Sequence, residues 1–257
     1  DQHRAARESL NDPGCLIVDE VHRFETKTYR NSLGGIGVNV DLRSGNFDET
    51  RIGLTATPWR SDPDQQSTMY RRWGGNFLLE GLTGFQAEPA DVEQELDALR
   101  SRLQSDGILA KPNYYTLPTS DQHQRITLNQ GKLTRTQLGM LVNNLGRNTK
   151  LLDTIRWLIE ERGRGSILLF GVTKRHAMMM SVALNKLGIL SASVDADTPS
   201  GVRRGTISKF ITGELQVLCN HSIFTTGFDA PNTDAIVICR PIRSKTLLDQ
   251  IFGRGLR

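Results

Sequence analysis

The second half of the chain alternates short apolar runs with longer amphipathic stretches. The apolar runs have the length and composition of buried strands, and they are residues 166–171, 190–196, 215–220 and 235–241. The stretches around them have the apolar spacing of helices, and they are residues 147–163, 173–188, 198–213 and 244–257. Because strands and helices alternate at short spacing, the pattern predicts an α/β fold with a parallel sheet and helices on both of its faces.

The first half of the chain is less regular. Two apolar runs predict buried strands, one at 15–20 and one that starts at Arg51. A strongly amphipathic stretch at 91–107 predicts a helix that ends at its glycine. Residues 111–146 are mixed and polar, so we place the connection between two domains there.

Length, charge and cysteine content narrow the class of protein. The 257 residues fit two compact domains, and the net charge of +4 favours anionic partners only slightly. The three cysteines, Cys15, Cys219 and Cys239, lie in apolar runs without the spacing of a zinc or redox site. This pattern predicts buried free thiols in a reducing compartment. We see no signal peptide and no apolar run of membrane-spanning length, so we expect a cytoplasmic protein without membrane contact.

Two adjacent carboxylates, Asp19 and Glu20, stand at the end of the first predicted strand. In open parallel sheets, ligands bind beyond the carboxyl ends of the strands. A carboxylate at that place can hold Mg²⁺ on the phosphates of a nucleotide. Its neighbour can accept a proton from an attacking water. The alternative is a solvated acidic pair without a function.

Three further stretches carry candidate chemistry, and each also has a plain interpretation. The sequences TATP at 55–58 and TTGFDAP at 225–231 follow apolar runs, and either can be a simple turn. Gln250, Arg254 and Arg257 are four and three residues apart, so they share one face of a predicted helix. Arginines placed at a transferring phosphate stabilise the charge of the transition state. A basic helix end favoured by the helix dipole is the alternative.

In this order, the stretches resemble the motifs of superfamily 2 helicases and translocases. DEVH at 19–22 resembles motif II of the DEAH type, GLTATP at 53–58 motif III, SILLFGVTKRHA at 166–177 motif IV, TTGFDAP at 225–231 motif V, and QIFGRGLR at 250–257 motif VI. The resemblance covers nearly the whole chain. It is strongest to the branch that acts on double-stranded DNA, with its XPB-like, RadD-like and restriction-motor proteins.

The resemblance implies two RecA-like parallel-sheet lobes of the P-loop NTPase fold, the first of them incomplete. Residues 1–115 would be the C-terminal part of the first lobe, 116–146 a connecting segment and 147–257 the second lobe. The phosphate-binding sequence G-x-x-x-x-G-K-[ST] does not occur in the chain. We interpret the chain as a fragment that lacks the P-loop and expect no ATP turnover from it alone. The alternative is a degenerate homologue that does not hydrolyse ATP.

The resemblance also implies cofactors, ATP and Mg²⁺, and a role for each site residue. Asp19 would hold the metal and Glu20 would be the general base. The nucleotide contacts of the second lobe would be Gly227, Asp229, Gln250, Arg254 and Arg257. The residues that couple nucleotide state to the other lobe would be His22, Thr55 and Thr57. The nucleic-acid contacts would be Thr173, Lys174, Arg175 and Thr225, although the first three fit a plain helix start equally well.

These roles describe an ATP-dependent helicase or translocase core whose partner is nucleic acid, with duplex DNA the expected substrate. A second hypothesis is a helicase-like nucleic-acid-binding or regulatory module that does not hydrolyse ATP. A third is a motor subunit with partner subunits of a repair, restriction or defence system.

Two other features of the second half favour structural roles. The three consecutive methionines at 178–180 point in different directions on a helix, which predicts core packing and not a metal site. Asp195 and Asp197 could bind a cation. The sequence around them, DADTPS, instead favours a turn in which Thr198 caps a helix that starts at Pro199.

Overall fold

The fold is described from a computed structural model, in which the chain divides into two compact units, 1–106 and 107–257. The described residues are 15–21, 26, 30–31, 50–55, 64, 67–69, 92–118, 133–221, 230–242 and 245–253. The finer division into 1–115, 116–146 and 147–257 stays a prediction.

The first unit contains a pair of parallel strands and a helix. Strand β1, Cys15–Asp19, pairs with β2, Thr50–Leu54, in the register that places Asp19 beside Leu54. Both strands and helix α5, Val92–Ser105, confirm the predicted elements. Helix α5 is followed by Gly107 in the left-handed conformation with φ +73°, which glycine adopts without steric cost.

Strand β1 was predicted to be buried, and the structure buries it on one face of the β1–β2 pair. Val18 is buried, with 4% of its surface exposed, whereas Ile17 on the opposite face is 61% exposed. Successive residues of a strand point to opposite faces, so an apolar run does not by itself require two covered faces.

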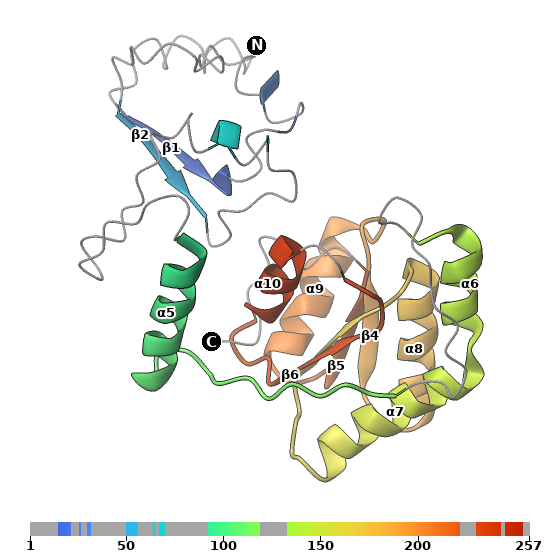
Figure 1. The fold of residues 1–257 in the computed structure, drawn as a ribbon. Helices are drawn as coiled ribbons and strands as arrows, with labels where there is room; N and C mark the ends of the chain where they lie inside the picture. The colour runs from blue at the N-terminus through green and yellow to red at the C-terminus, as the bar shows by residue number, and fades with distance from the viewer. Residues whose placement is uncertain are drawn as a thin grey trace. The chain divides into compact units, whose positions relative to one another are not determined.

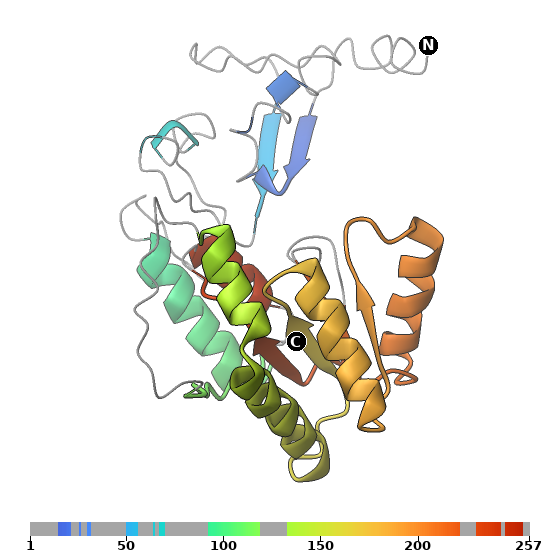
Figure 2. The ribbon, with the colours of Figure 1, turned by 90° about the vertical axis from the view of Figure 1, so that its right-hand side faces the viewer.

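The second unit is a four-stranded parallel sheet with helices on both faces (Figures 1 and 2). Its strands are β3 Ile167–Phe170, β4 Ser191–Val194, β5 Val217–Asn220 and β6 Ala235–Ile238, in the order β4-β5-β3-β6. Its helices are α6 Arg135–Asn143, α7 Leu145–Glu160, α8 Lys174–Lys186, α9 Ser200–Ile211 and α10 Lys245–Phe252. The predicted α/β fold with a parallel sheet is confirmed.

The alternation of side chains along β3 produces two separate cores. Ile167 and Leu169 pack with residues of α7 and α8, including Ile155 and Leu184. Leu168 and Phe170 point to the other face, where they pack with Phe210 of α9 and Ile251 of α10. All four β3 side chains are at most 1% exposed, as expected for a central strand of a parallel sheet.

One element was missed by the sequence analysis. Helix α6 lies within the stretch 111–146 that we interpreted as a connection. Its start is fixed by a capping box, in which Thr134 Oγ1 accepts the N–H of Gln137 and Gln137 Oε1 accepts the N–H of Thr134. This T-x-x-Q pattern is visible in the sequence and could have located the helix.

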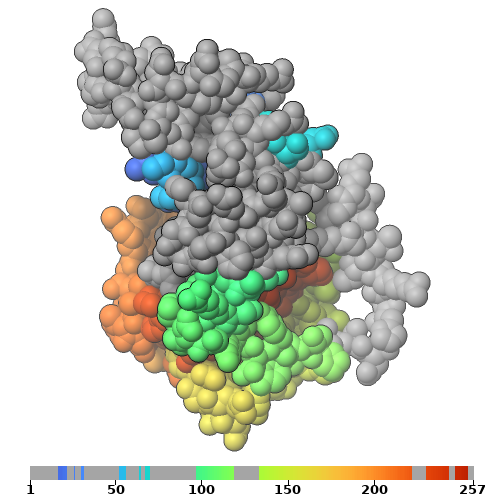
Figure 3. All heavy atoms as spheres, turned by 60° about the vertical axis from the view of Figure 1, so that its left-hand side comes forward, coloured from blue at the N-terminus to red at the C-terminus, as the bar shows by residue number. Residues whose placement is uncertain are grey.

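The segment 107–118 forms neither a helix nor a strand, and it is mostly exposed at the surface of the second unit (Figure 3). Its aromatic residues make edge contacts, Tyr114 with Phe252 of α10 and Tyr115 with Trp157 of α7, with ring centroids 5.2 and 6.5 Å apart. Lys150 Nζ also donates a hydrogen bond to the carbonyl of Pro118. The segment is therefore attached to two helices that belong to opposite faces of the sheet.

Other expectations for the second unit have mixed outcomes. Cys219 and Cys239 are free and buried as predicted, and burial raises the pKa of both thiols, to about 12 for Cys239. Met180 is in the core, and Met179 packs against it, but Met178 is 56% exposed.

No helix in the described part of the chain is long and apolar enough to cross a membrane.

Candidate functional site

The candidate site of the first unit is the carboxyl edge of the β1–β2 pair. Parallel pairing places Asp19 beside Leu54, so the next residues, Glu20 and Thr55, leave the two strands at the same edge. The structure thus brings together three of the residues that the sequence analysis selected. This is the edge at which open parallel sheets bind ligands.

The backbone at Glu20 is unusual. Its φ is +52°, the left-handed region that non-glycine residues rarely adopt. The N–H of Glu20 donates a 2.8 Å hydrogen bond to Oδ1 of Asp19, which closes a tight turn at the end of the strand. A residue in this conformation raises the free energy of the folded state, and such residues concentrate at functional sites.

The residues at this edge fit a magnesium ion. Mg²⁺ takes one or two carboxylates from the protein and completes its shell with water and phosphate oxygens. Asp19 is exposed at the strand end, and its bond from the Glu20 N–H fixes the direction of the carboxylate. Within the residues that the structure describes, no group of three or more histidine, cysteine, aspartate or glutamate side chains is arranged to hold a metal ion.

A separate candidate region, in the second unit, is the loop between β3 and α8. Thr173 is the N-cap of α8, because its hydroxyl oxygen accepts the N–H of His176 at 3.1 Å. Lys174 Nζ forms an ion pair with Asp197 Oδ2 at 2.5 Å, and this bond raises the pKa of the lysine. Arg175 is exposed. Thr173 therefore has the helix-start role, while the charges of Lys174 and Arg175 lie at the surface of the sheet's carboxyl edge.

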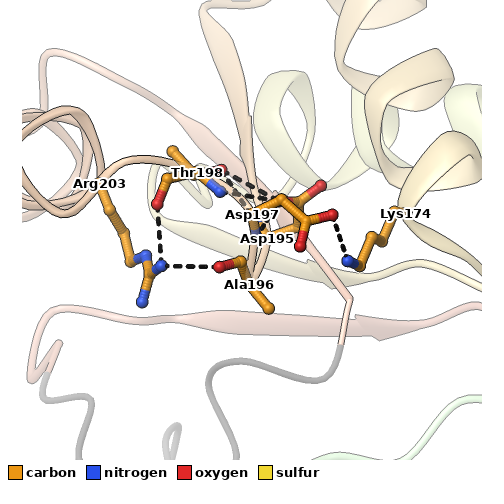
Figure 4. Close-up of polar contacts among 6 residues, drawn as sticks. All are labelled: Lys174, Asp195, Ala196, Asp197, Thr198 and Arg203. Atoms are coloured by element: carbon orange, nitrogen blue, oxygen red, sulfur yellow. Dashed lines mark hydrogen bonds and ion pairs between the residues drawn. The ribbon is translucent and has the colours of Figure 1, made fainter.

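The loop after β4 presents Asp197 to that lysine (Figure 4). Oδ1 of Asp195 accepts the N–H groups of Asp197 and Thr198, at 2.8 and 3.0 Å. The turn that we predicted is present, but the predicted cap is wrong. Pro199 precedes α9 without a side-chain cap bond, and Thr198 Oγ1 instead accepts the N–H of Asp195 at 2.9 Å.

Positive charge gathers at the same edge of the second sheet. His221, after β5, donates from Nδ1 to the carbonyl of Gly171. Burial lowers its pKa, and the positive charges of Arg240 and Lys174 lower it further. Burial also lowers the pKa of Arg240, which follows β6. His221 is therefore neutral at neutral pH, and the positive charge of this surface comes from Lys174, Arg175 and Arg240. Such a surface attracts anions.

A buried polar network behind this edge was not found by the sequence analysis. Asn148 Oδ1 accepts the Nε2 hydrogen of His176, and Arg147 donates to the carbonyl of Cys239. Burial, and secondarily the charge of Arg147, lowers the pKa of His176 to about 4. Arg147 is 8% exposed, and its second terminal nitrogen has no hydrogen-bond partner among the residues that the structure describes. The network ties the start of α7 to the loops that leave β3 and β6.

Several predicted site residues lie outside the described part of the chain, so their roles stay predictions. They are His22, Thr57, Thr225, Gly227, Asp229, Arg254 and Arg257. Gln250 is described and lies on α10, which ends at Phe252.

Several known proteins with similar sequences are named as helicases. The chain is 42% identical over 262 residues to the putative ATP-dependent helicase IRC3 of Saccharomyces cerevisiae, across 99% of this chain and 33% of the relative. It is 23% identical to the putative DNA 3'-5' helicase Rad25 of Haloarcula marismortui, across 95% of this chain and 33% of the relative. The chain thus spans about a third of the length of these relatives.

A solved structure supports the fold over the whole chain. The fragment structure of a putative HsdR subunit of a type I restriction enzyme from Vibrio vulnificus has a TM-score of 0.58 at 20% identity, covering 99% of this chain and 42% of that one. The RecA-like α/β class is thereby confirmed. Residues 148–257 match the family of the helicase conserved C-terminal domain. This part of the chain is similar to helicase C-terminal domains, and the resemblance to superfamily 2 helicases is confirmed.

Proposed function

We propose that the chain is the ATP-dependent motor core of a helicase or translocase that acts on duplex DNA. The observation that carries the proposal is the common strand edge at which Asp19, Glu20 and Thr55 meet, in a chain that also contains a region similar to helicase C-terminal domains. The relatives, a putative ATP-dependent helicase and a putative DNA 3'-5' helicase, support ATP and DNA as ligands.

In this proposal Asp19 holds Mg²⁺, which neutralises charge on the phosphate oxygens of ATP. Glu20 accepts the proton of the attacking water. Gln250, Arg254 and Arg257 contact the γ-phosphate, where the guanidinium groups stabilise the developing negative charge. Gly227 and Asp229 contact the nucleotide from the second domain.

The remaining residues couple nucleotide state to nucleic acid. His22, Thr55 and Thr57 transmit the state of the nucleotide to the second domain. Lys174 and Arg175, with Thr225 and the helix-capping Thr173, lie along the phosphate backbone. Because phosphate contacts release counterions, the affinity for duplex DNA falls steeply as salt rises. Partner subunits of a repair, restriction or defence system belong to the same proposal.

The test is ATP turnover, with and without duplex DNA, by the longest form of the protein that the gene encodes and by the 257-residue chain. We expect DNA-stimulated turnover in the long form, with kcat lowered about 10²- to 10⁴-fold by Glu20→Gln. Glu214→Gln, which removes the same charge at the end of α9, is the matched control and leaves turnover unchanged.

Two results would contradict this proposal in different ways. Turnover that survives Glu20→Gln would remove the general base from the mechanism. Duplex binding without any turnover in either form would favour the non-hydrolysing nucleic-acid-binding module.

A further inference from the structure

The ion pair between Lys174 and Asp197 joins two loops at the carboxyl edge of the second sheet. Nζ and Oδ2 are 2.5 Å apart, and the two side chains are 43% and 79% exposed. The lysine starts α8 and the aspartate follows β4, so the pair links residues 23 positions apart. Figure 4 shows the carboxylate of Asp197 directed at the ammonium group.

The loop that carries Asp197 is held by contacts on both sides of it. Asp195 Oδ1 accepts the N–H groups of Asp197 and Thr198 and is also contacted by the hydroxyl of Thr198. Arg203 of α9 donates from one terminal nitrogen to the carbonyls of Ala196 and Thr198, at 3.1 and 2.8 Å. The backbone on either side of Asp197 is thus fixed before any ligand binds.

Folding stability does not explain this arrangement. An exposed ion pair between a lysine and a carboxylate adds little to stability, because water and salt screen it. An anion that approaches Lys174 meets an ammonium group that already has a carboxylate partner.

We propose that Asp197 is an internal competitor of nucleic-acid phosphate for Lys174 and thereby sets the affinity of this surface for the backbone. The proposal rests on the nucleic-acid-binding role assigned to Lys174 under the proposed function. When a phosphate binds, the ammonium group exchanges the carboxylate for a phosphate oxygen, and the held loop keeps the negative charge of Asp197 nearby. Weaker binding of each phosphate lets a translocating protein release and rebind the backbone.

The exchange of the carboxylate for a phosphate changes how the binding constant for DNA depends on salt concentration. Each cation that neutralises a DNA phosphate steepens the dependence of log K on log salt by about 0.9. A lysine that is already paired with a carboxylate adds little to this salt slope. When a phosphate replaces the carboxylate, the negative charge of the carboxylate becomes free and attracts a cation from the solution, which offsets the cation released from the DNA. Removing the carboxylate should therefore tighten binding and steepen the salt dependence together.

The experiment measures the dissociation constant of a fluorescein-labelled 20-base-pair duplex by anisotropy, between 50 and 200 mM KCl, for the 257-residue chain. Asp197→Asn is expected to bind about two to five times more tightly at the lowest salt. Its salt slope is expected to be steeper by about one. Glu214→Gln is the matched control, because it removes one negative charge at the amino-terminal edge of the same sheet, before β5.

A double-mutant cycle separates competition from a general change in charge. Lys174→Met should weaken binding, and Asp197→Asn should have no further effect in that background. An equal gain in the Lys174→Met background, or a gain no larger than that of Glu214→Gln, overturns the proposal while the proposed function stands. Duplex binding by neither the unmodified chain nor Asp197→Asn overturns both.

Discussion

Asn148, in the first turn of α7, accepts a 3.1 Å hydrogen bond from His176, in the first turn of α8. The direction of the bond follows from the other ring nitrogen, because Nδ1 of His176 accepts the backbone N–H of Val172 and so leaves the proton on Nε2. His176 has no exposed surface. The pair fixes the start of α8, and with it the position of Lys174, against the start of α7.

Replacing Asn148 tests how much this bond stabilises the domain. Asn148→Ala leaves the Nε2 hydrogen of His176 without an acceptor and also removes the bond from Asn148 to the carbonyl of Val142. We expect the free energy of unfolding to fall by about 1–3 kcal/mol, measured by urea denaturation at neutral pH. Asn143→Ala, at an exposed position of α6, is the control and should change it by less than about 0.5 kcal/mol. Equal effects of the two changes would show that the buried bond adds nothing.

The low pKa of His176 predicts a specific loss of stability in mild acid. Burial lowers the pKa from 6.5 to about 4, so the unfolded chain binds a proton between these values and the folded chain does not. The contribution of His176 to the free energy of unfolding is therefore fully present above about pH 6.5 and is lost as the pH falls toward 4. Between pH 7.5 and pH 5 the loss should be about 2 kcal/mol.

The measurement is urea unfolding of the chain and of His176→Gln at both pH values. The variant should be less stable at pH 7.5 but should lose about 2 kcal/mol less on acidification. The comparison cancels the contribution of other titrating groups such as His221, whose pKa is also lowered. Identical pH dependence in the two proteins would contradict the buried neutral histidine.

The charge of Arg147 is the second cause of that low pKa. Arg147→Met removes the charge and leaves a side chain of comparable length in the core. The pKa of His176 should then rise, as followed by the chemical shift of its ring in an NMR titration. His221 is the internal control, because Arg147 is not among the causes of its lowered pKa. An unchanged pKa of His176 would mean that burial alone determines it.

Much of the fold could be predicted from the sequence because its elements are local patterns. Among the described elements of the second unit, the strand and helix periods located all four strands and four of the five helices, and α6 was missed. The boundaries moved by a few residues, as at α9, which starts at Ser200. Thr198 was assigned to the wrong cap because a threonine before a proline fits either a helix cap or a turn, and only the position of Asp195 decides between them.

The buried contacts of the site could not be predicted in the same way. Arg147 contacts a carbonyl 92 positions away, and Asn148 contacts a side chain 28 positions away. In sequence both residues look like the polar start of an exposed helix. Their role depends on which face of the sheet α7 covers, and no local pattern specifies that face.

Gly171 shows a packing requirement that can be tested against a second glycine. A Cβ at Gly171 would lie 2.9 Å from the backbone nitrogen and the Cβ of Ala177, at the point where α8 approaches the end of β3. Gly171→Ala should therefore destabilise the domain by about 1–3 kcal/mol. Gly205, within α9, has open space around its Cβ position, so Gly205→Ala should stabilise by about 0.5–1 kcal/mol. Thermal unfolding of the two variants measures both, and a stabilising Gly171→Ala would contradict the close approach.

The left-handed backbone at Glu20 predicts that glycine is more stable than alanine at the proposed general base. Both Glu20→Gly and Glu20→Ala remove the carboxylate, so their difference reports the backbone alone. Alanine keeps a Cβ that disfavours φ near +52°, whereas glycine adopts it freely. We expect Glu20→Gly to unfold with a free energy about 1 kcal/mol higher than Glu20→Ala. In a helix or a strand glycine is the less stable of the two, so the order of the two melting temperatures decides whether the turn after β1 holds its left-handed conformation in solution.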